Sequence, residues 1–230
     1  MAEFSQTSSG LFKNQKNSLA IRIWHWLVFL GFTASLVTVL LGSTLFKTKQ
    51  NISTVMDEVA HKGGIVTKDQ AFAVAHAYSD KIWDTHKIIG FVLCFLLLSR
   101  WIIESRQPKD EKLSARIRIA LNFRPVIEKD IMERNHYVLV KRGYLIFYFL
   151  FLMMALTGLV MAFEDLEFLK PFRKTASSVH LFFQYGIYAY ILLHIIGVVR
   201  ADLGNNKGIV SGMISGGGNH FIKNESSANP

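Results

Sequence analysis

The stretch Val179–Val199, VHLFFQYGIYAYILLHIIGVV, contains no Asp, Glu, Lys or Arg and holds two histidines, His180 and His194, fourteen residues apart. At about 100° per residue, this separation comes to roughly 1400°, which is about 40° short of four helical turns. Both imidazoles therefore project from one side of a helix, about 21 Å apart along its axis. In a hydrocarbon layer about 30 Å thick, one histidine lies near each edge. The spacing predicts two sites at two depths of a membrane.

Three further runs of the chain are long and nearly free of charge. They are Ile23–Phe46, the run Ile88–Ser99 with its apolar flanks, and Gly143–Phe163. With flanks each run reaches about 20 residues, the length that a membrane-spanning helix requires. The sequence therefore predicts an all-α integral membrane protein, a four-helix bundle occupying residues 19–217, with flexible tails at 1–18 and 218–230. The predicted spans are about 22–46, 82–104, 141–163 and 179–201.

The basic residues are unevenly distributed along the chain, which has a net charge of +9. Eleven of the 26 Lys and Arg residues lie between Arg100 and Arg142, and six more lie between Lys13 and Arg22 or between Arg200 and Lys223. The two segments on the opposite side hold nine. This asymmetry predicts that both termini and the middle loop are cytoplasmic. The charge is thus explained by the membrane and not by a nucleic-acid partner. The first apolar run is too long for a signal peptide.

The loops also carry helix signals. In the outer loop Lys47–Lys81, Ser53 is a candidate cap for a turn through His61, and Gly63-Gly64 breaks that turn. The sequence Thr67-Lys68-Asp69-Gln70 is typical of a capping box, so Ala71–Lys81 is expected to run helically into the second span.

The inner loop alternates basic and apolar residues. We expect an amphipathic helix at Leu113–Leu121, lying along the cytoplasmic headgroups and limited by Pro125.

Two more histidines lie inside the spans. The first span starts on the inner side, so His25, within Trp24-His25-Trp26, lies at about the depth of His194. The second span starts on the outer side, so His86 lies level with His180. A single interfacial histidine is often only a polar anchor, but four at matched depths favour function, because ionisable groups within spans are costly. The predicted pairs are His25/His194 and His86/His180.

Each depth offers two imidazoles without a neighbouring cysteine or carboxylate in the spans, which does not suit tetrahedral zinc. Two opposed imidazoles suit the axial positions of a haem iron, since the porphyrin supplies the other four ligands. The only cysteine is Cys94, so there is no attachment signature and the haem is expected to be held non-covalently. Ligation of both axial positions leaves electron transfer as the chemistry. The methionines of the third span, Met153, Met154 and Met161, are interpreted as filler.

Several residues support this interpretation less strongly. Gly90 and Gly197 lie one turn from His86 and His194, where a missing side chain leaves room for a porphyrin face. Five cations near the membrane edges are either partners for haem propionates or ordinary snorkelling residues: Arg22, Lys87, Arg173, Lys174 and Arg200. Three histidines outside the spans, His61, His76 and His136, receive no role.

The chain resembles the bacterial cytochrome b561 family, which includes the b-type cytochrome subunit of nickel–iron hydrogenases. The resemblance rests on Arg22–Trp26, on Trp83–His86, on the His180/His194 pair and on the closing stretch Asn206–Gly217, NKGIVSGMISGG. It implies that His25, His86, His180 and His194 ligate two b haems. It also implies that the protein passes electrons between the quinone pool and a partner.

The predicted function is that of a di-haem b-type cytochrome of the bacterial inner membrane, transferring electrons between quinone and a redox partner subunit. Whether it acts as an enzyme in its own right is left open. One alternative is a stand-alone, quinone-linked superoxide oxidase with the same haem fold. A second, of another class, is a transporter whose histidines relay protons. Transporters commonly have broken helices or inverted repeats, and the sequence suggests neither.

Overall fold

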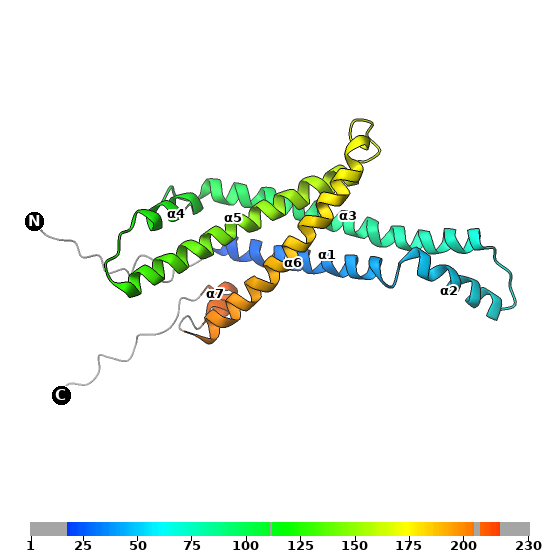
Figure 1. The fold of residues 1–230 in the computed structure, drawn as a ribbon, viewed down its shortest axis with the longest axis horizontal. Coiled ribbons are helices and arrows are strands. Elements are labelled where there is room, and N and C mark those ends of the chain that lie inside the picture. The colour runs from blue at the N-terminus through cyan, green and yellow to red at the C-terminus, as the bar shows by residue number, and fades with distance from the viewer. Residues whose placement is uncertain (1–17, 111, 205–207, 217–230) are drawn as a thin grey trace, which may run out of the picture. The chain divides into compact units, whose positions relative to one another are not determined.

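A computed structural model describes residues 18–110, 112–204 and 208–216, and their fold is all-α. Both predicted tails lie almost wholly outside the described residues. Figure 1 shows the helices in chain order: α1 (Leu19–Ser43), α2 (Thr48–His61), α3 (Lys68–Arg106), α4 (Leu113–Asn122), α5 (Glu128–Ala162), the 3₁₀ helix η2 (Lys170–Phe172), α6 (Arg173–Leu203) and α7 (Ile209–Ser215).

Four segments of the described chain are long and apolar enough to cross a membrane: Leu19–Ser43, Lys68–Arg106, Glu128–Ala162 and Lys170–Leu203. Each contains most or all of one predicted span. Many of their large apolar side chains are exposed on the protein surface. Such a surface suits contact with lipid better than contact with water. The predicted fold class, an all-α membrane protein with four spanning helices, is confirmed.

The second spanning helix extends well beyond the apolar run. α3 has 39 residues, which at 1.5 Å per residue make it about 58 Å long, nearly twice the thickness of the hydrocarbon layer. It begins with the predicted capping box, since Thr67 N donates to Gln70 Oε1 at 2.9 Å and Gln70 N donates to Thr67 Oγ1 at 3.3 Å. The expected helical entry through Ala71–Lys81 is therefore confirmed.

The expected role of Ser53 as a helix cap is wrong. Ser53 lies inside α2, which already begins at Thr48. α2 starts earlier than expected because α1 ends in a turn that a hydrogen bond from Phe46 N to Leu41 O closes at 2.9 Å. The amide of Asn51 then donates to Leu45 O at 2.7 Å and fixes the start of α2.

The inner loop is more helical than expected. The predicted helix at Leu113–Leu121 is present as α4, which ends at Asn122 before Pro125. α5 then begins at Glu128, so residues 128–140 form a helix that continues into the third span. Two acidic residues in its first turn, Glu128 and Asp130, favour a helix start there, because the helix dipole attracts negative charge to its amino-terminal end.

The described helices form two compact units. Of the described residues, unit 1 holds those up to His25, those from Ser99 to Met154 and those from Ser178 onwards, and unit 2 holds Trp26–Leu98 and Ala155–Ser177. Unit 1 contains a fully buried Phe151 and a close approach between α5 and α6, where a Cβ on Gly186 would lie 3.1 Å from Leu150 Cδ2. Three of the four candidate histidines, His25, His180 and His194, belong to unit 1, and His86 belongs to unit 2.

Candidate functional site

The structure brings His25 and His194 together in unit 1. Their ring centroids are 6.3 Å apart, and the ring planes are inclined by 56°. Metal–imidazole bonds of about 2 Å place the centroids of two opposed rings roughly 6 Å apart. The observed separation therefore suits a single metal ion between the two imidazoles.

Two aromatic rings, one on α6 and one on α5, form a column with the His194 imidazole. The ring of Tyr190, one turn before His194, is stacked on the imidazole, with centroids 6.1 Å apart and an interplanar angle of 6°. The ring of Phe147 on α5 is in turn stacked on Tyr190, with centroids 5.0 Å apart and an interplanar angle of 29°. Because aromatic pairs at such distances are favourable, this column limits the orientations that the His194 ring can adopt.

A buried arginine ties together the helix ends around His25. Arg100 of α3 is only 8% exposed. Its Nη2 lies 2.7 Å from Glu104 Oε2, and its Nε donates to the Tyr148 hydroxyl at 2.9 Å. The guanidinium also lies 5.9 Å from the ring of Trp24, which is itself buried next to His25. A buried charge needs such partners, because its desolvation is otherwise strongly unfavourable.

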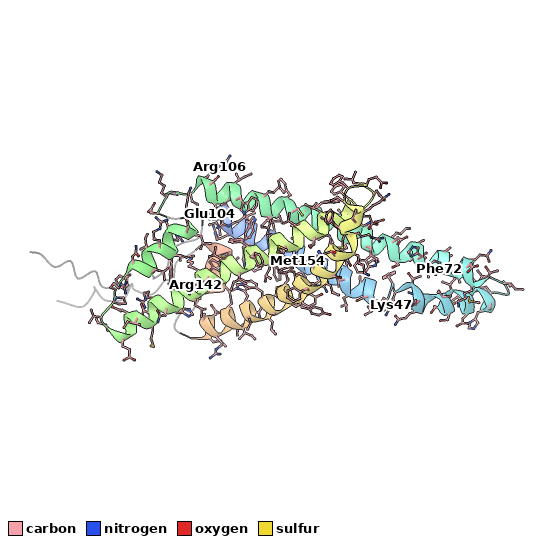
Figure 2. The ribbon with its side chains drawn as sticks, turned by 45° about the horizontal axis from the view of Figure 1, so that its top comes forward. Lys47, Phe72, Glu104, Arg106, Arg142 and Met154 are labelled. Atoms are coloured by element: carbon pink, nitrogen blue, oxygen red, sulfur yellow. The ribbon has the colours of Figure 1, made fainter. Side chains whose placement is uncertain are left out.

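Glu104 extends this network to α4. Its Oε1 accepts a hydrogen bond of 2.6 Å from Leu113 N, the first residue of α4. One carboxylate thus pairs with Arg100 and caps the next helix. Figure 2 shows Glu104 near the end of α3, close to α4, with Arg106 a little farther along the same helix.

The carboxyl-terminal helix α7 contacts the start of α1. Asp202 Oδ1 accepts hydrogen bonds from Gly208 N at 2.9 Å and Ile209 N at 3.0 Å, which fixes the beginning of α7. Arg22, one turn before His25, donates from Nη1 to Ile214 O at 2.9 Å. At the end of α7, Gly216 has φ +74°, and a Cβ there would lie 2.6 Å from Arg22 Cζ. Arg22 therefore joins the start of α1, the segment that carries His25, to α7.

In unit 2, His86 of α3 faces hydroxyl groups of α1. Its Nδ1 lies 2.9 Å from Thr38 Oγ1 and 3.5 Å from Ser35 Oγ. Trp83, one turn earlier on α3, meets the imidazole edge-on, with centroids 5.8 Å apart at 80°. These contacts hold the His86 ring from two sides.

Small residues let α1 and α3 approach closely on either side of these hydroxyls. A Cβ on Gly31 would lie 2.7 Å from Leu93 Cδ2, and a Cβ on Gly42 would lie 3.0 Å from Trp83 Cζ2. Gly31, Ser35, Thr38 and Gly42 follow one another at four, three and four residues, so they share one face of α1. Small residues at such positions are typical of helix packing in membranes.

His180 lies near the start of α6 and is half-buried. His86 and His180 belong to different units, so their pairing stays a prediction.

The residues present fit the predicted haem. Among the described residues there is no group of three or more His, Cys, Asp or Glu side chains that could hold a metal by themselves. Two imidazoles are nevertheless a sufficient protein contribution where a porphyrin provides four further ligands. A Cβ built on Gly90 or on Gly197 would meet no atom within 4 Å, so no described residue fills the space beside either glycine.

Three edge cations, Lys87, Arg173 and Arg22, have identified partners among the described residues. Lys87 Nζ lies 3.2 Å from Asp84 Oδ1, Arg173 pairs with Glu164, and Arg22 bonds the Ile214 carbonyl. The first two are exposed ion pairs, of a kind that contributes little to stability. The positions of Lys87 and Arg173 are therefore explained as those of ordinary cations at the membrane edge, without a haem propionate as partner.

Sequence reasoning missed Thr38 and the Arg100 network. The signal for Thr38 was present as hydroxyl residues within the apolar run Ile23–Phe46. The signal for Arg100 was a single cation between apolar residues at the end of the second span. Neither signal identifies a partner, because the contacts depend on how helices distant in sequence pack.

A family profile described as prokaryotic cytochrome b561 matches residues 17–216, which include all four spanning helices and all four candidate histidines. No curated protein and no solved structure matches the chain. The match extends over well more than half of the 230 residues. The chain therefore belongs to the prokaryotic cytochrome b561 family of multi-pass membrane proteins, which transfer electrons through b-type haem.

Proposed function

We propose that this protein binds two b haems and conducts electrons between the quinone pool and a redox partner subunit in the bacterial inner membrane. His25 and His194 would ligate the inner haem, and His86 and His180 the outer one. The observation that carries the proposal is the 6.3 Å separation of the His25 and His194 rings in a member of this family. The outer pair is supported by the matched depths of the two histidines in their spans.

The haem, when bound, supplies an iron that gains and loses one electron without binding substrate. The chain supplies the rest. His25 and His194 would hold the iron through their imidazoles, and the stacked ring of Tyr190 and the Arg100 network limit the movement of the helix segments that carry His194 and His25. Such constraints would keep the orientation of the two imidazoles fixed.

The proposed orientation places both termini and the loop between the second and third spans in the cytoplasm. It is supported by the excess of Lys and Arg in those segments. The inner haem would then lie on the cytoplasmic side. The outer loop, with α2 and the long extension of α3, offers a surface for a redox partner.

A stand-alone quinone-linked superoxide oxidase would have the same haem arrangement. It would exchange electrons with superoxide and not with a partner subunit. A proton-relay transporter is less well supported. Each of the four spans is one unbroken helix in the part of the chain that the structure describes, whereas transporter sites typically interrupt helices near the midplane.

The test is a dithionite-reduced minus oxidised spectrum of the purified protein, with haem measured per protein. The proposal expects low-spin b-haem bands and two haems per chain. A chain without these bands would overturn the haem function. Reduction by a quinol in proteoliposomes, with transfer to a co-purified subunit and not to dioxygen, would then favour the conduit over the stand-alone oxidase. When the candidate ligands are replaced, His76→Ala is a suitable control and should keep both haems, because His76 is exposed and pairs with Asp80 outside the predicted spans.

A further inference from the structure

Thr38 is one of the few polar side chains buried inside the spans, with 6% exposure. Its hydroxyl donates to the carbonyl oxygen of Ser35, one turn earlier in α1, at 2.7 Å. Threonine commonly forms this bond in helices. A hydroxyl has one hydrogen and two lone pairs, so the lone pairs of Oγ1 remain available after this bond forms. One of them can accept from His86 Nδ1, which lies 2.9 Å away.

We infer that Thr38 is a positioning residue that accepts a hydrogen bond from Nδ1–H of His86. Such a bond places the proton of the neutral imidazole on Nδ1 and leaves the lone pair of Nε2 for a metal. It also fixes the rotation of the ring and increases its basicity as a ligand. The inference rests on the proposed function, because it takes His86 to be a haem ligand.

The Ser35 hydroxyl is a weaker partner than that of Thr38. Its Oγ lies 3.5 Å from His86 Nδ1, at the outer limit of a hydrogen bond, whereas 2.9 Å is the ordinary length. The Ser35 backbone carbonyl takes the hydroxyl hydrogen of Thr38 and is also a hydrogen-bond partner of His86. Thr38 is therefore the side chain, and Ser35 the backbone group, that orients the His86 ring.

The surrounding packing keeps this relay in place. Gly31 and Gly42 bring α1 against α3 on either side of Thr38, and Trp83 meets the edge of the His86 ring. The distance between Thr38 and His86 therefore depends on the contact between two helices and not on a mobile loop. A lost hydrogen bond here would change the electronic properties of the ligand while the helices stay packed.

The experiment compares Thr38→Val, Thr38→Ser and Thr33→Val in the haem-loaded protein. Valine has the shape of threonine without the hydroxyl, and serine restores the hydroxyl. Thr33 provides a matched control, because its hydroxyl also bonds a carbonyl within α1, that of Phe29 at 2.8 Å, but it is exposed. The readouts are the midpoint potentials of the two haems, the g-values of the oxidised haems and the haem content.

We expect Thr38→Val to raise the midpoint potential of one haem, because a less basic imidazole stabilises ferric iron less. The expected change is about threefold to tenfold in the equilibrium constant for reduction, where tenfold is about 59 mV for one electron. The same haem should bind about tenfold more weakly. Thr38→Ser and Thr33→Val should resemble the wild type.

Unchanged potentials and g-values in Thr38→Val would overturn the inference while two haems per chain still support the proposed function. If the His86→Ala variant kept the haem content of the wild type, the proposed function itself would be contradicted. If Thr38→Val fails to accumulate in the membrane, Thr38→Ala is compared with Thr38→Ser under the same criteria.

Discussion

Arg100 Nε donates a hydrogen bond of 2.9 Å to the Tyr148 hydroxyl, and the pair lies beside the indole of Trp24. Three spanning helices thus meet at one buried cation, and Trp24, which lies against it, is the sequence neighbour of His25. Within a membrane such a charge is stable only where its partners remain in place. The cation therefore acts as a structural support for the segment that carries a candidate ligand.

Replacing Arg100 with Gln should destabilise the protein, because Glu104 would keep a charge in a partly buried place without its partner. Removal of one member of a buried ion pair typically costs about 3 kcal/mol or more. The measurement is thermal loss of the reduced haem band in detergent. Arg106→Gln is the control, since Arg106 is exposed at the end of the same helix and should change stability by less than about 0.5 kcal/mol. Equal melting of both variants would refute the role given to Arg100.

Glu104 has two functions that two substitutions can separate. Glu104→Gln keeps an oxygen that can accept from Leu113 N, whereas Glu104→Ala removes both the cap and the charge. Loss of a cap costs about 1 kcal/mol and should loosen α4. We expect trypsin to cleave at Arg116 and Arg118 faster in the Ala variant than in the Gln variant. Identical cleavage in the two variants would show that the cap does not hold α4.

Gly197 offers a test for a group beside His194. A Cβ at Gly197 meets no atom within 4 Å, and the same is true at Gly143 on α5. Leucine should therefore be tolerated by the fold at both positions. We expect Gly197→Leu to lower the haem content and Gly143→Leu to leave it unchanged, as measured by the pyridine haemochrome assay. Full haem content in Gly197→Leu would exclude a porphyrin face at that glycine.

Gly216 combines a left-handed backbone with a close neighbour. Alanine at φ +74° costs about 1 kcal/mol and would also displace the Arg22 guanidinium. We expect faster amide hydrogen exchange across Ile209–Ser215 in Gly216→Ala. Gly63→Ala is the control, because Gly63 has a similar φ of +77° and nothing within 4 Å, so exchange in α7 should not change. Unaltered exchange in Gly216→Ala would contradict the docking of α7 on Arg22.

Apolar run length predicted the four spans, because the thickness of the hydrocarbon layer limits what a spanning helix can be. The capping box at Thr67–Gln70 was equally predictable, since both of its hydrogen bonds are local. Ser53 failed as a cap because α2 already begins at Thr48, after a turn closed between Phe46 and Leu41 that has no distinctive sequence pattern. α7 was also missed, since its start depends on Asp202, several residues before it.

In the candidate site, too, the sequence indicated candidate residues but not the contacts between them. The four histidines could be named from the sequence, because an imidazole in an apolar run is unfavourable without a function. Thr38 and Arg100 could not be given partners, because these lie 48 residues away in each case, at His86 and Tyr148. Only the packing of the helices brings them together.

The pairing of the histidines is the central claim, and haem counts in double variants test it most directly. His25 and His194 serve one haem in this account, so the His25→Ala/His194→Ala protein should lose the same single haem as either single variant and keep one per chain. The His86→Ala/His194→Ala protein should keep none, because one ligand is removed from each site. A His25→Ala/His194→Ala protein without haem, or a His86→Ala/His194→Ala protein that keeps one haem, would contradict the account.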